Sequence, residues 1–385
     1  MTLQSPFVRD RGWDFEGEDT QYLTHNFHPF PGKFIPQIPK KLMAELLPDG
    51  GTVFDPFCGS GTTLVEANLS GNPCVGVDIN PLFVMISRAK TTPLAEGEIL
   101  YLQEWADQVS EKGGSLYYGG LGTKRSPPST EQKPNLAGWF STIALNEIGM
   151  IKSEISHLPS GRMKDFCNTA LSSILVRVSY QDSDTRYARV EKKLSPTQTT
   201  RIFRDKLKDM IERIREFSAR ASDATVEVLC HDARSLTDAP ELGNRAFDLV
   251  ITSPPYVNAY DYHKYHRQRM NWLDVDSSPV RKLEIGGHDR YTRKNADPAT
   301  YFSDLQRCFA ETSERMRRGG RCCVVIGDGI VGGRAVPTHE LIVEALSRAG
   351  LKFDYGIARR VDSRSKYFRN GARIETEYII VTKKP

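Results

Sequence analysis

A glycine-rich turn near the start of the chain separates an apolar strand from a helix. It reads VFDPFCGSGTT over residues 53–63, and the next strand ends at Val75-Gly76-Val77-Asp78. Strand, turn, helix and strand in this order form one unit of a parallel sheet with a crossover helix. Thr63 and Glu66 also have the spacing of a capping box at the start of that helix. The segment therefore predicts an α/β fold that binds a ligand at the carboxyl edge of its sheet.

The strand and helix alternation resumes in the second half of the chain. Apolar strands are expected near residues 226–230, 247–252, 321–327, 351–358 and 376–382, with helices in most of the gaps. No long helix joins the last two strands, so they should pair as an antiparallel hairpin at one sheet edge. We therefore expect seven strands in a mostly parallel sheet.

Residues 91–225 interrupt this alternation. They begin polar and glycine-rich and then become mostly helical. We interpret residues 1–90 together with 226–385 as one α/β domain and residues 91–225 as a mainly helical insertion. The apolar residues on one face of the last helix are Ile202, Leu207, Met210, Ile211, Ile214 and Phe217.

Composition bears on the compartment in which the protein works and on the kinds of ligand it binds. Charged residues make up 26% of the 385, and the net charge of +4 is too small to identify a polyanionic partner by itself. No apolar run approaches the roughly 18 residues of a membrane span, and the first residues lack the pattern of a signal peptide. The seven cysteines are scattered, without zinc-site spacing. We therefore expect a cytoplasmic protein that binds no metal and no membrane.

The turn at 53–63 favours a nucleoside ligand. Asp78 has the position at which a carboxylate accepts hydrogen bonds from ribose hydroxyls in doubly wound folds. Leu64 occupies the place of the third glycine of a dinucleotide fingerprint, which disfavours a nicotinamide-dependent oxidoreductase. Asp55 would repel a pyrophosphate but suits a cation, and S-adenosylmethionine carries both an ammonium and a sulfonium group.

A second motif, Ser253-Pro254-Pro255-Tyr256, follows the apolar strand 247–252. Two prolines make a rigid turn without backbone donors, which leaves carbonyls free to accept. Ser253 Oγ and the Pro254 carbonyl would accept both hydrogens of an exocyclic amine and aim its lone pair at a methyl group. Tyr256 would stack on a base rotated out of the helix. Such catalysis is alignment and electrostatics, with no metal or covalent nucleophile.

In these motifs and their order the chain resembles the S-adenosylmethionine-dependent DNA amino-methyltransferases. DPFCGSGTT matches the family's motif I, HPFPGKF at 28–34 motif X, DINP at 78–81 motif II and CHDAR at 230–234 motif III. The resemblance spans residues 28–90 and 226–385 and implies a Rossmann-like class I methyltransferase. The cofactor residues it implies are His28, Lys33, Phe34, Asp55, Pro56, Phe57, Gly59, Ser60, Gly61, Thr62, Thr63, Asp78, Ile79, Asn80, Asp232 and Ala233, with Asp232 accepting from the adenine amine.

The first position of the catalytic motif bears on the target base. In the family, serine there is more typical of cytosine-N4 enzymes, and aspartate or asparagine of adenine-N6 enzymes. We therefore expect site-specific methylation of cytosine N4 in double-stranded DNA. Adenine N6, an RNA amino-methyltransferase and a non-catalytic regulator that binds S-adenosylmethionine and DNA are the alternatives. Cytosine-C5 chemistry is disfavoured because the one Pro-Cys dipeptide, Pro73-Cys74, begins the wrong strand.

Basic and aromatic residues near the motif predict the DNA surface. Segment 257–269, with Trp272 beyond it, supplies such residues, although an amphipathic helix packed on the core explains it as well. Segment 359–373 carries six basic residues against one acid, and residues 285–294 are a weaker candidate. The expected DNA contacts are Tyr260, His263, Lys264, Arg267, Arg290, Arg364, Lys366 and Arg369.

The insertion is the candidate target-recognition or clamp domain. Its acidic and basic residues nearly balance, and it precedes motif III, whereas the most similar class in motif order places recognition after that motif. The polar stretch 179–187 would either read bases or form a solvated loop. A cognate restriction endonuclease is a candidate partner, and both a monomer and a homodimer remain open.

Overall fold

An eight-stranded sheet forms the centre of the protein. The computed structural model describes residues 7–118, 136, 138–258, 261–287, 297–331, 334–361 and 375–385. The strand order of the sheet is β1-β11-β12-β8-β7-β2-β3-β6. Its strands are β1 (Phe7–Arg9), β2 (Val53–Asp55), β3 (Cys74–Asp78), β6 (Val226–Cys230), β7 (Phe247–Thr252), β8 (Met316–Gly327), β11 (Lys352–Arg360) and β12 (Thr376–Lys383).

The sheet is mostly parallel, as predicted, with one strand more than expected. β12 runs antiparallel to both β8 and β11, so the predicted hairpin is present. β1 pairs parallel with β11 and takes the edge position beyond that hairpin. Its three residues are too few for a periodic pattern. Gly356 admits this strand, since a Cβ there would lie 2.4 Å from the Phe7 ring.

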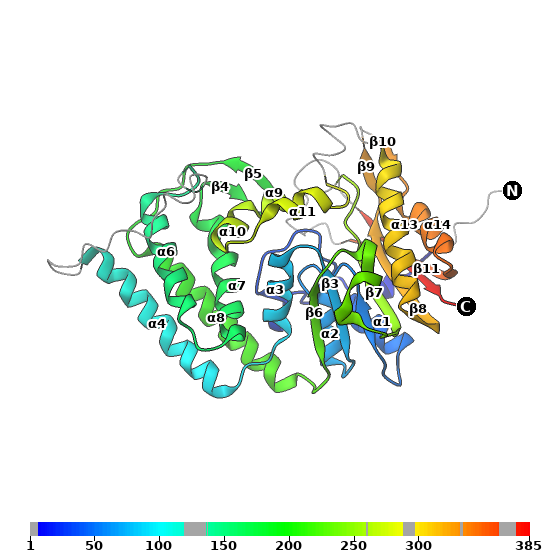
Figure 1. The fold of residues 1–385 in the computed structure, drawn as a ribbon, viewed down its shortest axis with the longest axis horizontal. Coiled ribbons are helices and arrows are strands. Elements are labelled where there is room, and N and C mark those ends of the chain that lie inside the picture. Colours follow the sequence, from blue (N-terminus) through cyan, green and yellow to red (C-terminus); the bar gives the residue numbers. More distant parts are fainter. Residues whose placement is uncertain are drawn as a thin grey trace.

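Helices cover both faces of the sheet, as Figure 1 shows. Leu249 and Ile251 of β7 share a core with α1 and α2, whereas Val250 between them packs with α13 and α14, because successive strand side chains point to opposite faces. These helices are α1 (Gln37–Leu46), α2 (Thr62–Leu69), α3 (Pro81–Thr91), α13 (Pro298–Glu314) and α14 (Thr338–Arg348).

The insertion forms a helical body beside the sheet, on the left of Figure 1. The apolar face predicted for its last helix is buried in a core that also includes Leu23, Phe27, Val65 and Trp272 from outside the insertion. Its elements are α4 (Glu96–Tyr118), α6 (Thr142–Ser156), α7 (Gly161–Val178), α8 (Gln198–Arg220) and the antiparallel pair β4 (Gln181–Ser183) and β5 (Arg186–Arg189).

The direction of strand connection reverses between β2 and β7. From β2 the chain passes to β3 and β6 on one side, and then returns to β7 on the other side of β2. Ligands of open α/β sheets bind at such a reversal, outside the carboxyl ends of the strands. Three short helices follow β7 there, namely α9 (Tyr262–Tyr265), α10 (Arg267–Trp272) and α11 (Ser277–Leu283).

The remaining described elements are a small β9 (Gly329–Val331) and β10 (Arg334–Val336) pair and short 3₁₀ turns. Among the described residues, no helix combines the length and apolar character of a membrane span.

Candidate active site

The glycine-rich turn is packed too tightly for side chains at its two glycines. Gly59 and Gly61 have φ of 49° and 77°. A Cβ on Gly59 would lie 3.2 Å from the Phe30 ring, and one on Gly61 would lie 2.9 Å from Ser87 Oγ. Gly59 N also donates a 3.0 Å hydrogen bond to Asp78 Oδ2. The turn is therefore fixed against the end of β3 before any ligand binds.

The expected capping box is wrong. Gly61, not a side chain, caps α2. Thr63 Oγ1 donates instead to the Ile251 carbonyl at 3.2 Å. Glu66 is buried and accepts from Tyr22 Oη at 2.7 Å, with His25 Nε2 also 2.7 Å away. Burial raises the pKa of Glu66 to about 7. The side chains of Thr63 and Glu66 thus make tertiary contacts in place of the predicted capping box.

A cavity at the carboxyl edge brings the cofactor motifs and the catalytic motif together. It encloses about 930 Å³ of empty space, part of it open to solvent. The predicted residues that line it are Lys33, Phe34, Pro56, Phe57, Gly59, Ser60, Thr62, Asp78, Ile79, Asn80, Asp232, Ala233, Ser253, Pro254, Pro255 and Tyr256.

Four predicted cofactor residues are not among those that line the cavity. Asp55 is buried beneath it and accepts from Thr252 Oγ1 at 2.6 Å and Phe57 N at 3.1 Å. His28 is buried against the insertion, with its Nε2 2.9 Å from Ser172 Oγ. Gly61 and Thr63 belong to the start of α2. Their part in cofactor binding stays a prediction. The contacts of Asp55, Gly61 and Thr63 hold the turn in place, whereas His28 contacts the insertion.

Asp78 is partly buried and contacts the glycine-rich turn. Asp78 Oδ2 accepts from Gly59 N, and Asp78 Oδ1 accepts from Asn80 N at 2.8 Å. Burial nevertheless raises the pKa of Asp78 to about 7. Donors from a ligand, such as ribose hydroxyls, would favour its ionised form.

Asp232 is held by its neighbour Arg234. The Arg234 guanidinium donates to Asp232 Oδ2 at 2.7 Å and to the Leu283 carbonyl at 2.9 Å. Burial opposes the charge on Asp232, but the bonds from Arg234 outweigh it and hold the pKa below its ordinary value. Arg234 thus fixes Asp232 against the end of α11.

Several residues that line the cavity were not predicted. Phe30 and Tyr262 stack with ring centres 6.0 Å apart, and Phe83 packs edge-on against Phe30 at 4.6 Å. Glu284 accepts from Tyr262 N at 2.5 Å and pairs with His263. Phe30 lies within the HPFPGKF motif, which was a usable signal. Glu284 carries no motif and reaches the cavity only through the fold after α11.

The catalytic turn is anchored by two hydroxyl groups. Tyr301 Oη donates to the Pro255 carbonyl at 2.9 Å, and Tyr256 Oη donates to Glu377 Oε1 at 3.3 Å. Burial, together with the Glu377 charge, raises the pKa of Tyr256 well above its ordinary value. Ser253 Oγ is buried and has no hydrogen-bond partner of ordinary length among the described residues. It therefore lies beside the cavity as an acceptor without an internal partner of ordinary length.

The predicted DNA residues have different surroundings. Arg267 is exposed over the Tyr187 ring, and Lys264 is partly buried. His263 pairs with Glu284. The helix after the motif also packs inward, since Arg269 and Trp272 are buried, so neither is available to DNA. Tyr260, Arg290, Arg364, Lys366 and Arg369 lie outside the described residues.

Sequence similarity to known proteins extends over most of the chain. Residues 8–89 match the model of a family described as DNA methylase. The chain is 23% identical to the Type II methyltransferase M.MvaI of Kocuria varians, over 92% of this chain and 88% of that protein. It is 24% identical to the Type II methyltransferase M.MjaII of Methanocaldococcus jannaschii, over 92% and 79%. These matches support the DNA amino-methyltransferase family for this chain.

A solved structure similar to this methyltransferase is the rRNA methyltransferase aviRa of Streptomyces viridochromogenes. The identity is 11%, the match covers 93% of this chain and 88% of that one, and the TM-score is 0.35.

S-adenosylmethionine is the cofactor of this amino-methyltransferase, and the walls of the cavity fit it. Asp78, Asp232 and Glu284 line the cavity together with Lys33, so carboxylates outnumber lysine around a ligand that carries two cationic groups. Asp78 would take the ribose hydroxyls. Lys33 Nζ donates to the His25 carbonyl at 2.7 Å, and burial lowers its pKa to about 8. It would face the cofactor carboxylate.

Proposed function

We propose that this amino-methyltransferase is site-specific and transfers a methyl group to N4 of a flipped-out cytosine in DNA. The observation that carries the proposal is Ser253 Oγ, a buried hydroxyl of a residue that lines the cofactor cavity. It has no hydrogen-bond partner of ordinary length in the described chain, and its interaction with the Tyr256 hydroxyl opposes the rise that burial causes in the pKa of that tyrosine. An unpaired buried polar group costs about 1–3 kcal/mol. A ligand amine that donates to it would offset this cost.

The chain's own residues would align the amine. Its lone pair is delocalised into the base ring, so the amine is a poor nucleophile. Ser253 Oγ would accept one amine hydrogen and the Pro254 carbonyl the other, which favours a pyramidal nitrogen with a directed lone pair. When bound, S-adenosylmethionine supplies the electrophilic methyl group.

Tyr256 would hold the base. Its ring lines the cavity, and its hydroxyl is tied to Glu377 on β12, so the ring face has a fixed direction. The base would stack on this face after leaving the helix, as bases do in enzymes that act on single nucleotides. Serine at the first position of the motif supports cytosine, and adenine N6 is the second candidate.

DNA would approach the carboxyl edge of the sheet. β11 runs parallel to β8 and β7, because β12 is antiparallel to both β11 and β8. β11 therefore ends at Arg360, and β12 begins at Thr376, at the same edge of the sheet as Ser253. Arg267 adds an exposed cation there. These positions support the proposed phosphate contacts of the basic segment.

The test is the identity of the modified nucleoside. The protein is incubated with S-adenosylmethionine and unmethylated genomic DNA, and the DNA is digested to nucleosides for mass spectrometry. N4-methylcytosine that depends on the enzyme is the expected result. N6-methyladenine would overturn the choice of base while leaving the alignment of an amine by Ser253 intact, and C5-methylcytosine would overturn both.

A further inference from the structure

The β4 and β5 hairpin belongs to the insertion in sequence but packs against the helices that follow the catalytic turn. Gln181 Nε2 donates to the Tyr265 carbonyl at 3.2 Å. From the other side, Gln268 Nε2 donates to Tyr187 Oη at 3.1 Å. Figure 1 shows the hairpin beside α9 and α10. These two hydrogen bonds position the hairpin next to the wall of the active site.

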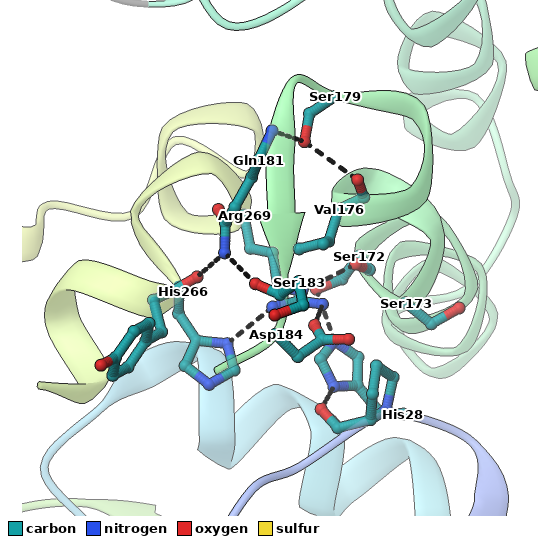
Figure 2. A network of polar contacts seen from close by, with 12 residues as sticks. His28, Ser172, Ser173, Val176, Ser179, Gln181, Ser183, Asp184, His266 and Arg269 are labelled. Atoms are coloured by element: carbon teal, nitrogen blue, oxygen red, sulfur yellow. Dashed lines mark hydrogen bonds and ion pairs between the residues drawn. The ribbon is translucent and has the colours of Figure 1, made fainter. Parts of the chain in front are cut away.

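A buried arginine locks this position. Arg269 is fully buried and forms an ion pair with Asp184 at the hairpin turn. Its Nε donates to the Ser172 carbonyl of α7 at 2.9 Å, and its Nη1 lies 3.2 Å from His266 Nδ1. Figure 2 shows that these groups converge from the hairpin, α7 and the segment after the catalytic turn. A charge with no solvent exposure needs such partners, so the hairpin cannot shift without cost.

Aromatic packing of His266 connects the contacts of Arg269 to the cavity wall. The His266 ring packs edge-on against Phe83, with centres 5.1 Å apart, and tilts over Phe30 at 6.1 Å. Phe30 and Phe83 both line the cavity. The orientation of the hairpin is therefore tied to the place where base and cofactor would meet.

The β4 and β5 hairpin carries two exposed arginines. Arg186 is 69% exposed. Arg189 is exposed and lies over the Tyr180 ring, with 4.6 Å from its guanidinium carbon to the ring centre. Arg267 of α10 lies over Tyr187 at 5.8 Å. A guanidinium held against a ring keeps donors on its edge, and such donors suit phosphate oxygens.

We propose that the β4 and β5 hairpin is a DNA-contacting element in which Arg186 and Arg189 bind backbone phosphates beside Arg267. This inference rests on the proposed function only in taking DNA as the substrate, and it does not depend on which base is methylated. The Asp184 and Arg269 pair positions the element and does not itself touch DNA.

A matched control exists on the same insertion. Arg220 is 64% exposed and lies 3.9 Å from Glu216, four residues away. Arg186 lies 3.6 Å from Asp182, also four residues away. Arg220 ends α8 shortly before β6 begins, so it lies at the amino edge of the parallel sheet, away from Ser253. R186A and R220A therefore remove equivalent side chains at opposite edges.

The experiment is a salt titration of binding to a fluorescently labelled duplex of arbitrary sequence, followed by anisotropy. Phosphate contacts are independent of sequence, so the unknown target site is not needed. R186A and R189A should each weaken binding several-fold and lower the slope of log affinity against log salt by about 0.9. R220A should match the wild type, and equal melting curves would establish that all variants are folded.

The inference is overturned if R186A and R189A retain the affinity and slope of R220A. The result is separate from the identity of the methylated base, because binding is measured without cofactor or turnover. Adenine methylation combined with weakened binding in R186A would contradict the proposed base and support the hairpin. Cytosine methylation with unchanged binding would do the reverse.

Discussion

Thr252 Oγ1 donates a 2.6 Å hydrogen bond to Asp55 Oδ1 and thereby joins the carboxyl ends of β7 and β2. Both side chains are buried. The residue that follows each strand, Pro56 after β2 and Ser253 after β7, lines the cavity. Burial raises the pKa of Asp55 to about 6, while the bond from Thr252 favours its ionised form. One buried link therefore sets the spacing between the cofactor turn and the catalytic turn.

Removal of this link should affect both stability and cofactor binding. T252V keeps the shape but leaves Asp55 with one donor fewer, which should cost about 1–3 kcal/mol of unfolding free energy. Urea unfolding measures this loss, and calorimetry with S-adenosylmethionine measures the weaker binding. T382V is the control, because buried Thr382 donates at 3.1 Å to a neutral carbonyl, that of Cys322. Equal cofactor affinity in both variants would contradict the role of the link.

Cofactor affinity should rise as the pH increases through about 7. Burial places the pKa of Asp78 at about 7 in the free protein, so Asp78 holds a proton below that pH. That proton is lost when the carboxylate accepts ribose hydroxyls, and proton release makes binding tighter at higher pH. Titrations by calorimetry between about pH 6 and pH 8 measure this dependence.

D78N should bind weakly and without that rise. Lys33 also lines the cavity, and its pKa of about 8 would weaken binding at the upper end of the range in both proteins. A rise that persists in D78N would assign the proton to another group.

The face of Tyr256 should matter more than its hydroxyl. Y256A removes the stacking surface and should lower kcat/KM for DNA by about 10- to 100-fold, since base stacking contributes about 1–3 kcal/mol. Y256F keeps the ring and loses the 3.3 Å bond to Glu377 and the interaction of the hydroxyl with Ser253, so its loss should stay below about tenfold. Steady-state kinetics on DNA compare the two. A Y256F enzyme as impaired as Y256A would show that the hydroxyl has the larger role.

Asp184 should contribute to stability more than its neighbour Asp182. D184A leaves the fully buried Arg269 without its carboxylate, which should cost about 3 kcal/mol. D182A removes a carboxylate of similar exposure that faces the exposed Arg186, and should cost less than about 1 kcal/mol. Thermal and urea unfolding measure both, and equal losses would contradict the importance of the buried pair.

Strands of the sheet were predictable from the sequence where a continuous apolar run marks a buried strand. β6 and β7 begin and end at the predicted residues, because their apolar runs are bounded by turns. β1 was not predictable, since its place depends on contact between Phe7 and the open backbone at Gly356. The same holds for Glu66, whose helical spacing suggested a cap but whose partners, Tyr22 and His25, come from a distant turn.

The site was predictable where one continuous segment builds it. Residues of the glycine-rich turn and of the Ser-Pro-Pro-Tyr turn line the cavity as expected, because each turn fixes its own backbone. Tyr262 and Glu284 enter through the packing of α9 and the end of α11, which no local pattern encodes. No local pattern encodes the contact of His28 with Ser172 of the insertion either.

The most direct measurement is the single-turnover rate of methyl transfer by S253A, with cofactor affinity measured on the same protein. Ser253 Oγ has no hydrogen-bond partner of ordinary length in the described chain, so the substitution removes no internal bond there beyond its interaction with the Tyr256 hydroxyl. If Ser253 Oγ holds an amine hydrogen, the rate should fall at least about tenfold while S-adenosylmethionine binds as before. An unchanged rate of methylation in S253A would contradict the proposed mechanism.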